Sequence, residues 1–157
     1  MTVIGFLSNV AVTGTVAGVG VGSSTEDIYE ALGNECVVDR NGKSLRLDYG
    51  IVEFALYAGC CEGVTVQAHR LVHGVVIPDA LKAAFSVQSD AISFSALRAE
   101  IEAGGDYSLE ERGRQFGYRS YRVVNTHVIL IVVDMSAGEG DLLAPGDLWS
   151  IAVSGRS

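Results

Sequence analysis

The sequence predicts an α+β fold in which short helices pack on a mainly antiparallel sheet. Many short segments alternate apolar with polar residues, which is typical of strands with one buried face. The chain has 19 glycines and only 2 prolines, which indicates tight turns between strands rather than flexible linkers. Two short segments begin with helix-capping residues and are followed by glycine, so we expect short helices among the strands.

The composition indicates a single folded domain over residues 1–157. Hydrophobic residues make up 48% of the chain and charged residues 19%, which is enough apolar surface for a sizeable core. This composition also excludes a globally disordered chain.

The N-terminal region is predicted to contain strands followed by one helix. Residues 2–21 are rich in β-branched residues punctuated by glycine, so we expect one or two strands there. A serine at position 23 or 24 can cap a helix whose first turn carries Glu26 and Asp27, and these acids suit the positive end of the helix dipole. Gly33 is the expected end of this helix.

A series of strands is predicted after this helix. The expected ranges are 36–38, 45–49, 51–57 and 64–71. Asn41-Gly42 is a strong hairpin signal between the first two. Residues 58–63 are predicted to form a turn that contains Cys60 and Cys61.

The second half begins with helical signals and returns to strands. Pro78 suits the start of a helix, and Ser93 or Ser95 can cap another that ends at Gly104-Gly105. Residues 106–117 are polar and are predicted to form a loop. The expected strands are 118–124, 127–133 and 148–153, and the very apolar 127–133 is predicted to be central.

The order of these elements suggests an internal duplication. A helix followed by three strands is predicted over 24–71 and again over 93–153. In this alignment residues 49–54 correspond to residues 125–130. The identity is low, so either chance or two similar α-β-β-β units sharing one core can explain the pattern.

The charge of the chain is acidic in both halves. The formal net charge is −8, and residues 1–78 and 79–157 each contribute −4. Such a field repels nucleic acid and anionic lipid and favours a basic protein partner. The alternative is that the acidic surface only keeps an apolar domain soluble.

The cysteines indicate a reducing compartment. Cys36, Cys60 and Cys61 are odd in number and two are adjacent, which makes a poor disulfide framework, so we expect a cytoplasmic protein. The apolar N-terminal stretch lacks the basic residues of a secretion signal, because the first Lys or Arg is Arg40. No stretch reaches the roughly 20 apolar residues that cross a bilayer.

The sequence contains no complete catalytic or metal-binding motif, so we expect no catalytic residue, no metal and no cofactor. His69 and His73 are four apart but fall at a predicted strand end, without further ligands beside them. The glycines at 18–22 precede a helix but have no lysine to hold a phosphate. Glu53 lies in an apolar strand and is expected to pair with a base such as Arg46 or Arg70, or to face water.

Two alternatives to a binding protein remain open. A small enzyme or ligand-binding protein could use Cys60, Cys61, His69 and Glu53, which could converge around the 51–71 hairpin. A structural homo-oligomer, such as a homodimer, could form by pairing of an exposed edge strand with its copy.

The loop before the last strand is the predicted partner-binding surface. It combines acids with leucines and precedes the single tryptophan, a composition that suits a basic protein partner. The alternative is an ordinary loop whose leucines tuck into the core. The residues predicted to contact the partner are Glu139, Asp141, Leu142, Leu143, Asp147 and Trp149.

Residues 18–71 resemble a group of small bacterial immunity proteins encoded beside polymorphic toxins. The resemblance is carried by a glycine-led helix that ends at Leu32-Gly33 and by the strand Tyr49-Gly50-x-x-Glu53-Phe54, followed by residues 66–71. The second half resembles the group only loosely, through Trp149-Ser150-Ile151. The resemblance implies a cytoplasmic protein that binds and blocks one cognate toxin, as in toxin–antitoxin pairs. It implies no catalytic residues.

Overall fold

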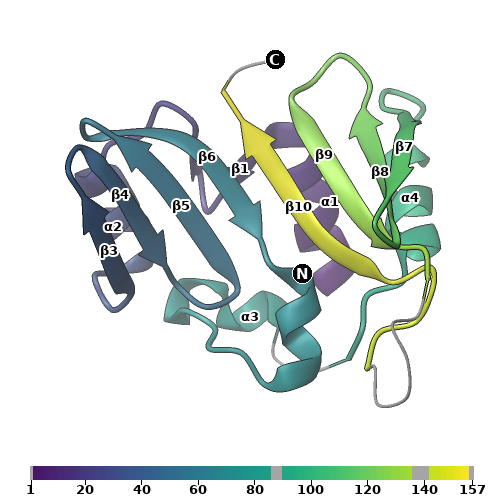
Figure 1. The fold of residues 1–157 in the computed structure, drawn as a ribbon, viewed down its shortest axis with the longest axis horizontal. Helices are drawn as coiled ribbons and strands as arrows, with labels where there is room; N and C mark the ends of the chain where they lie inside the picture. The colour runs from purple at the N-terminus through teal and green to yellow at the C-terminus, as the bar shows by residue number, and fades with distance from the viewer. Residues whose placement is uncertain (1, 86–89, 136–141, 156–157) are drawn as a thin grey trace.

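The computed structural model describes residues 2–85, 90–135 and 142–155 and confirms the predicted α+β fold class. Its centre is an eight-stranded antiparallel sheet with the strand order β3-β4-β5-β6-β10-β9-β8-β7 (Figure 1). The strands are β1 (Thr15–Val16), β2 (Val19–Gly20), β3 (Val37–Asn41), β4 (Ser44–Asp48), β5 (Val52–Tyr57), β6 (Cys60–Val66), β7 (Leu109–Gln115), β8 (Tyr118–Val123), β9 (Val128–Val133) and β10 (Leu148–Ser154). β1 and β2 form a separate short hairpin.

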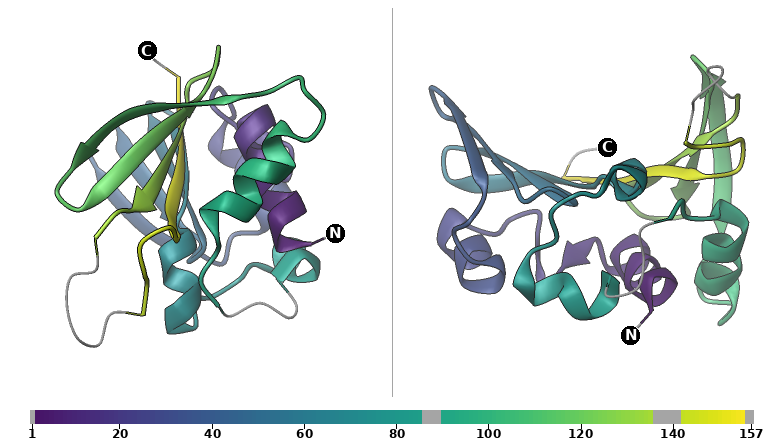
Figure 2. Two further views of the ribbon diagram at one scale, coloured as in Figure 1. Left: turned by 90° about the vertical axis from the view of Figure 1, so that its right-hand side faces the viewer. Right: turned by 90° about the horizontal axis from the view of Figure 1, so that it is seen from below.

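All four α helices pack on the same face of the large sheet. Figure 2 shows them together below the sheet in its right-hand view. The helices are α1 (Val3–Thr13), α2 (Thr25–Leu32), α3 (Lys82–Phe85) and α4 (Phe94–Glu102), with the 3-10 helices η1 (Ala68–His73) and η2 (Asp79–Leu81). One hydrophobic core fills the space between these helices and the sheet.

Alternation along the strands places the core on the helical side. In β4, Leu45 and Leu47 are buried while Ser44 and Arg46 are exposed. The predicted central strand, β9, lies inside the sheet between β10 and β8. The Asn41-Gly42 hairpin is confirmed, because β3 and β4 pair from Asn41↔Ser44 onward.

The prediction of strands over residues 2–21 is wrong for most of that range, because residues 3–13 form α1. The Thr2 hydroxyl accepts a hydrogen bond from the Gly5 amide at 2.9 Å and so caps the helix. Gly14 ends it with a φ of 72°. Apolar residues recur at helical spacing along α1, so burial outweighs the low helix propensity of β-branched side chains. The buried ones are Val3, Phe6, Leu7, Val10 and Ala11.

The other predicted helix starts are confirmed. Ser24 and Asp27 form a reciprocal capping box at the start of α2. The Ser93 hydroxyl accepts a hydrogen bond from the Ala96 amide at 3.3 Å at the start of α4. Pro78 directly precedes η2, which continues into α3.

Three further segments differ from the prediction. Residues 109–115, expected in a loop, form the edge strand β7, whose residues are mostly exposed and therefore lack an alternating apolar pattern. Cys60 and Cys61 lie in β6 because the preceding turn is only Ala58-Gly59. Residues 68–71, expected to extend a strand, belong to η1.

The same order of elements occurs twice in the fold, with four strands per unit rather than the three expected. α2 with β3–β6 and α4 with β7–β10 are each a helix followed by an antiparallel meander, and the two meanders join where β6 pairs with β10. The capping serine of each helix bridges to the chain at the start of its unit's fourth strand, in the pairs Ser24↔Cys60 and Ser93↔Asp147.

Candidate functional site

The face of the sheet opposite the four α helices is called the open face here. Its side chains alternate with those of the core, so Ser120 and Arg122 of β8 and Ile129 and Ile131 of β9 belong to it, each partly exposed. None of the described α helices covers it (Figure 2). A partly apolar sheet face without a covering layer is a candidate binding surface.

Trp149 lies at one end of the open face, beside η1. A β-bulge between Leu148 and Ser150 places Trp149 out of the regular register with β9. Its ring stacks on His69, with centroids 3.9 Å apart and an interplanar angle of 2°, and meets the edge of Tyr118 at 5.2 Å. The backbone oxygen of Trp149 lies 3.1 Å from His69 Nδ1. Burial lowers the pKa of His69, which favours the neutral imidazole.

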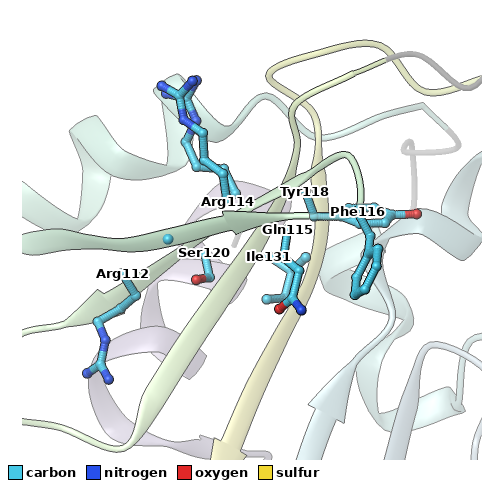
Figure 3. Close-up of a pocket in the computed structure, with 9 residues that line it drawn as sticks. Arg112, Arg114, Gln115, Phe116, Tyr118, Ser120 and Ile131 are labelled. Atoms are coloured by element: carbon cyan, nitrogen blue, oxygen red, sulfur yellow. The ribbon is translucent and has the colours of Figure 1, made fainter.

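Tyr118 connects this aromatic group to an open depression with a volume of about 460 Å³. Figure 3 shows the depression, with Arg112 at one end and Phe116 at the other. The side chains around it include Arg112, Gln115, Phe116, Tyr118, Ser120 and Ile131. Arg114 and Arg119 also line the depression, but the side chain of Arg114 points the other way (Figure 3) and Arg119 pairs with Asp134. The depression therefore combines the Arg112 guanidinium with two aromatic rings and an aliphatic side chain.

Phe116 occupies a turn position that disfavours it. It forms the β7–β8 turn with Gly117, and both have positive φ, 54° and 85°. Such two-residue turns favour asparagine or aspartate before glycine, and a bulky side chain there is strained. Phe116 is also 89% exposed, so it contributes little to the core. A strained, exposed aromatic residue is a candidate for recognition rather than folding.

Arg112 differs from the other arginines of the β7–β8 hairpin because it has no ion-pair or hydrogen-bond partner within the described residues. It lies at a bulge between Glu111 and Gly113, and its side chain leaves the strand in the opposite direction to that of Arg114 (Figure 3). The other arginines pair with acids, in the contacts Arg114–Glu111 at 3.3 Å, Arg119–Asp134 at 2.7 Å and Arg122–Glu110 at 2.6 Å.

A second polar cluster on the open face holds the scaffold together. Arg70 of η1 donates to Asp48 at 3.2 Å, to the Gly50 carbonyl at 2.9 Å and to Glu53 at 2.8 Å. The predicted pairing of Glu53 with Arg70 is thus confirmed, whereas Arg46 pairs with Asp39. Arg70 bridges the two carboxylates and the Gly50 carbonyl, so the cluster ties η1 to the β4–β5 turn.

Of the four groups expected to converge around the 51–71 hairpin, His69 and Glu53 lie close enough to interact, whereas the two cysteines lie away from them. Cys60 and Cys61 begin β6, whereas His69 follows the other end of this strand, which is roughly 20 Å long. Cys61 is buried in the core, and this burial raises the pKa of its thiol. The His69 ring stacks on Trp149, and the Glu53 carboxylate pairs with Arg70.

The loop predicted to bind a partner is described only from Leu142 onward, so Glu139 and Asp141 lie outside the described residues. Leu142 is 59% exposed, as a contact residue would be, whereas Leu143 is half-buried. The Asp147 carboxylate accepts a hydrogen bond from the Ala144 amide at 2.8 Å and so stabilises its own loop. Binding by this loop stays a prediction.

Sequence reasoning identified Trp149 but missed Arg112, Phe116 and Tyr118 as members of one surface.

Two properties of the described residues bear on other classes of site. No group of three or more His, Cys, Asp or Glu side chains within them could hold a metal ion. None of the helices in the described ranges has the length and apolar character to cross a membrane.

Comparison with known proteins adds no further assignment. The chain matches no protein-family model, and neither a curated protein nor a solved structure is significantly similar to it. The case for a function therefore depends on the geometry of the open face and on the resemblance carried by residues 18–71.

Proposed function

We propose that this protein is a non-catalytic binding protein that docks onto a cognate protein through its open face. The observation that carries the proposal is the depression between Arg112 and Phe116 on a sheet face without a helical cover. Arginine and aromatic side chains are enriched at the energetic centres of protein interfaces. Trp149 and Tyr118 extend the same surface towards η1.

The dimensions of the open face suit a protein partner better than a small molecule. Eight strands at about 4.8 Å spacing make a face roughly 30 Å across. A stable interface buries about 800 Å² on each partner. The rigid sheet keeps the contact residues in place before binding, which lowers the entropic cost of association.

The partner in this proposal is a bacterial toxin, which the protein neutralises by covering its active site. The resemblance of residues 18–71 to immunity proteins supports this class of partner. The net charge of −8 attracts a basic toxin at long range. A cytoplasmic location belongs to the same proposal and is supported by three cysteines that are all free thiols.

The pairing of polar groups supports a non-catalytic role. A reactive site needs a nucleophile or base within reach of the substrate and an unsatisfied group to orient it. Glu53 and Asp48 both pair with Arg70, and the thiols lie far from His69. These contacts stabilise the fold and leave Arg112 and Phe116 available for a partner.

The test is co-purification with the protein encoded by the adjacent gene. We expect a stable one-to-one complex by size exclusion with light scattering, and loss of the toxin's activity in the complex. Phe116→Ser should weaken this complex, whereas Val76→Ser, which changes another highly exposed apolar residue (72% exposed, against 89% for Phe116), should not. Absence of any complex with the adjacent-gene product would contradict the proposed function.

Self-association through β3 is the second candidate function. β3 is an edge strand in which all five residues are exposed, including Val37 at 70% and Val38 at 50%. An exposed regular edge can pair with its copy in a homodimer. Light scattering of the isolated protein decides this: a dimer mass that Val38→Lys converts to a monomer mass would support it.

A further inference from the structure

The β7–β8 hairpin is a basic region in an acidic chain. Residues 109–123 contain four arginines and two glutamates, a net charge of +2, whereas the whole chain carries −8. Long-range attraction follows the net charge, but the chemistry of a contact follows the groups at the contact. The positive charge of this hairpin therefore predicts an acidic contact region on the partner, whereas the negative net charge of the chain predicts a basic one.

Arg112 supplies the unbalanced charge of this hairpin. Its three arginine neighbours pair with Glu110, Glu111 and Asp134, and within the described residues Arg112 has no such partner. An exposed guanidinium can bind a carboxylate through two parallel hydrogen bonds.

A second unsatisfied donor lies close by on the open face. The Nε atom of Arg122 is buried and has no hydrogen-bond partner within the described residues. Arg122 pairs across the strands with Glu110, two residues before Arg112. Because this Nε atom is buried, a partner cannot reach it, and Arg112 is the guanidinium that an anionic partner can contact here.

The other end of the depression carries apolar side chains. Phe116 lies at the end opposite Arg112, and Ile131, Ser120 and Gln115 lie between them (Figure 3). A partner that filled the depression would therefore bring an acid to one end and an apolar side chain to the other.

We infer that the depression binds an acidic and apolar segment of the partner protein. A carboxylate of that segment pairs with Arg112, and an apolar side chain packs against Phe116 and Ile131. This inference rests on the proposed function and names the chemistry of its contact. It is compatible with a basic partner, because a carboxylate can lie in the active site of a protein whose surface is basic overall.

The inference can be tested without the natural partner. The probe is a synthetic peptide of about eight residues, roughly 25 Å when extended, in which glutamate alternates with leucine. The matched probe carries lysine in place of glutamate. Binding is followed by amide chemical shifts of the full-length protein. We expect the glutamate peptide to shift amides of residues 112–120 and the lysine peptide to leave them unchanged.

Two variants locate the contact. Arg112→Glu should weaken binding of the glutamate peptide by roughly tenfold, since a charge-assisted hydrogen-bonded pair becomes a repulsion. Arg46→Glu is the control, because Arg46 is another exposed arginine, 56% exposed, that lies on β4 in the other unit. Binding by Arg46→Glu should match that of the unmodified protein.

Several results would overturn the inference. They are shifts that map outside residues 112–120, equal shifts with the lysine peptide, equal shifts with a single-stranded oligonucleotide, no shifts at large excess, or unchanged binding by Arg112→Glu. The two proposals can fail separately. If the adjacent-gene product binds Arg112→Glu as tightly as the unmodified protein, the contact is elsewhere while the proposed function stands. If that product does not bind but the peptide shifts map as expected, the proposed function fails and the contact chemistry stands.

Discussion

The indole of Trp149 lies flat on the imidazole of His69, with the two rings 3.9 Å apart and tilted by only 2°. These residues are 80 positions apart in the sequence, and the contact joins η1 to the bulge of β10. Trp149 is the only tryptophan of the chain, so its fluorescence reports directly on this end of the open face.

Acidification should protonate His69, weaken the fold and quench Trp149. Burial lowers the pKa of His69 below the ordinary histidine value of 6.5, so the unfolded state binds this proton more readily than the folded state does. The free energy of unfolding should therefore fall as the pH drops from 6.5 towards the folded pKa. Urea unfolding between pH 7 and pH 5, followed by tryptophan emission, measures both effects.

His69→Gln is the control for this pH dependence, because glutamine keeps a polar side chain that does not titrate in this range. In His69→Gln the step in stability near pH 6.5 should be absent. The same step in both proteins would assign it to another group.

Loss of the Arg70 cluster should destabilise the fold. Arg70→Met leaves Glu53, whose side chain is 14% exposed, without its cation, and it removes the link between η1 and the β4–β5 turn. We expect a loss of about 2 kcal/mol in the free energy of unfolding, less than for a fully buried pair because Arg70 is 32% exposed. Chemical denaturation gives the value.

Arg46→Met is the matched control for Arg70→Met. Arg46 also pairs with a carboxylate, Asp39, but the two side chains are 56% and 67% exposed. The loss should stay within about 0.5 kcal/mol. Equal losses in the two variants would show that Arg70 has no special role.

Replacing Phe116 should stabilise the protein while weakening partner binding. Asparagine suits the left-handed position before Gly117 better than phenylalanine does, so Phe116→Asn should gain about 0.5–1 kcal/mol in folding. Thermal unfolding measures the gain, and the adjacent-gene complex measures the loss of binding.

Ala58→Asn provides the control for Phe116→Asn. Ala58 and Gly59 form the β5–β6 turn with φ values of 50° and 81°, close to those of Phe116 and Gly117. Ala58→Asn should stabilise the protein by a similar amount and leave binding unchanged. If both variants bind equally well, Phe116 is not a contact residue.

Removal of the Cys60 and Cys61 thiols should leave binding intact. Cys60 is exposed, Cys61 is buried, and within the described residues neither contacts an imidazole. Cys60→Ser should therefore keep full binding to the partner, and Cys61→Ser should lose only stability, because it places a hydroxyl in the core. A loss of function in Cys60→Ser at unchanged stability would revive the thiol-enzyme alternative.

The sequence patterns were reliable where local chemistry and burial agree. Ser24, Asp27 and Gly33 predicted α2, and the alternation of Leu45 and Leu47 predicted β4. They failed at α1 because its valines and threonines suit strands locally, whereas its helix depends on burial against the sheet and α4. They failed at β7 because an edge strand with exposed residues has no apolar period.

The candidate site was only partly predictable for the same reason. Trp149 was identified by its type and its place before the last strand. The polar composition of residues 106–117 predicts a loop, and this prediction places neither Arg112 on a strand nor Phe116 in a hairpin turn. Gly117, directly before the alternating segment 118–124, is the local signal for a turn at this position.

The duplicated architecture places different residues at the same corner of each half. The first hairpin of one half turns at Gly42, whose φ of 62° costs glycine little, and the first hairpin of the other half turns at Phe116. Gly42 thus shows the residue type that this turn position favours, whereas Phe116 is a residue type that the turn geometry disfavours. The first hairpin turn of one half therefore serves as a comparison for the first hairpin turn of the other, and this comparison marks Phe116 as a residue that folding alone does not explain.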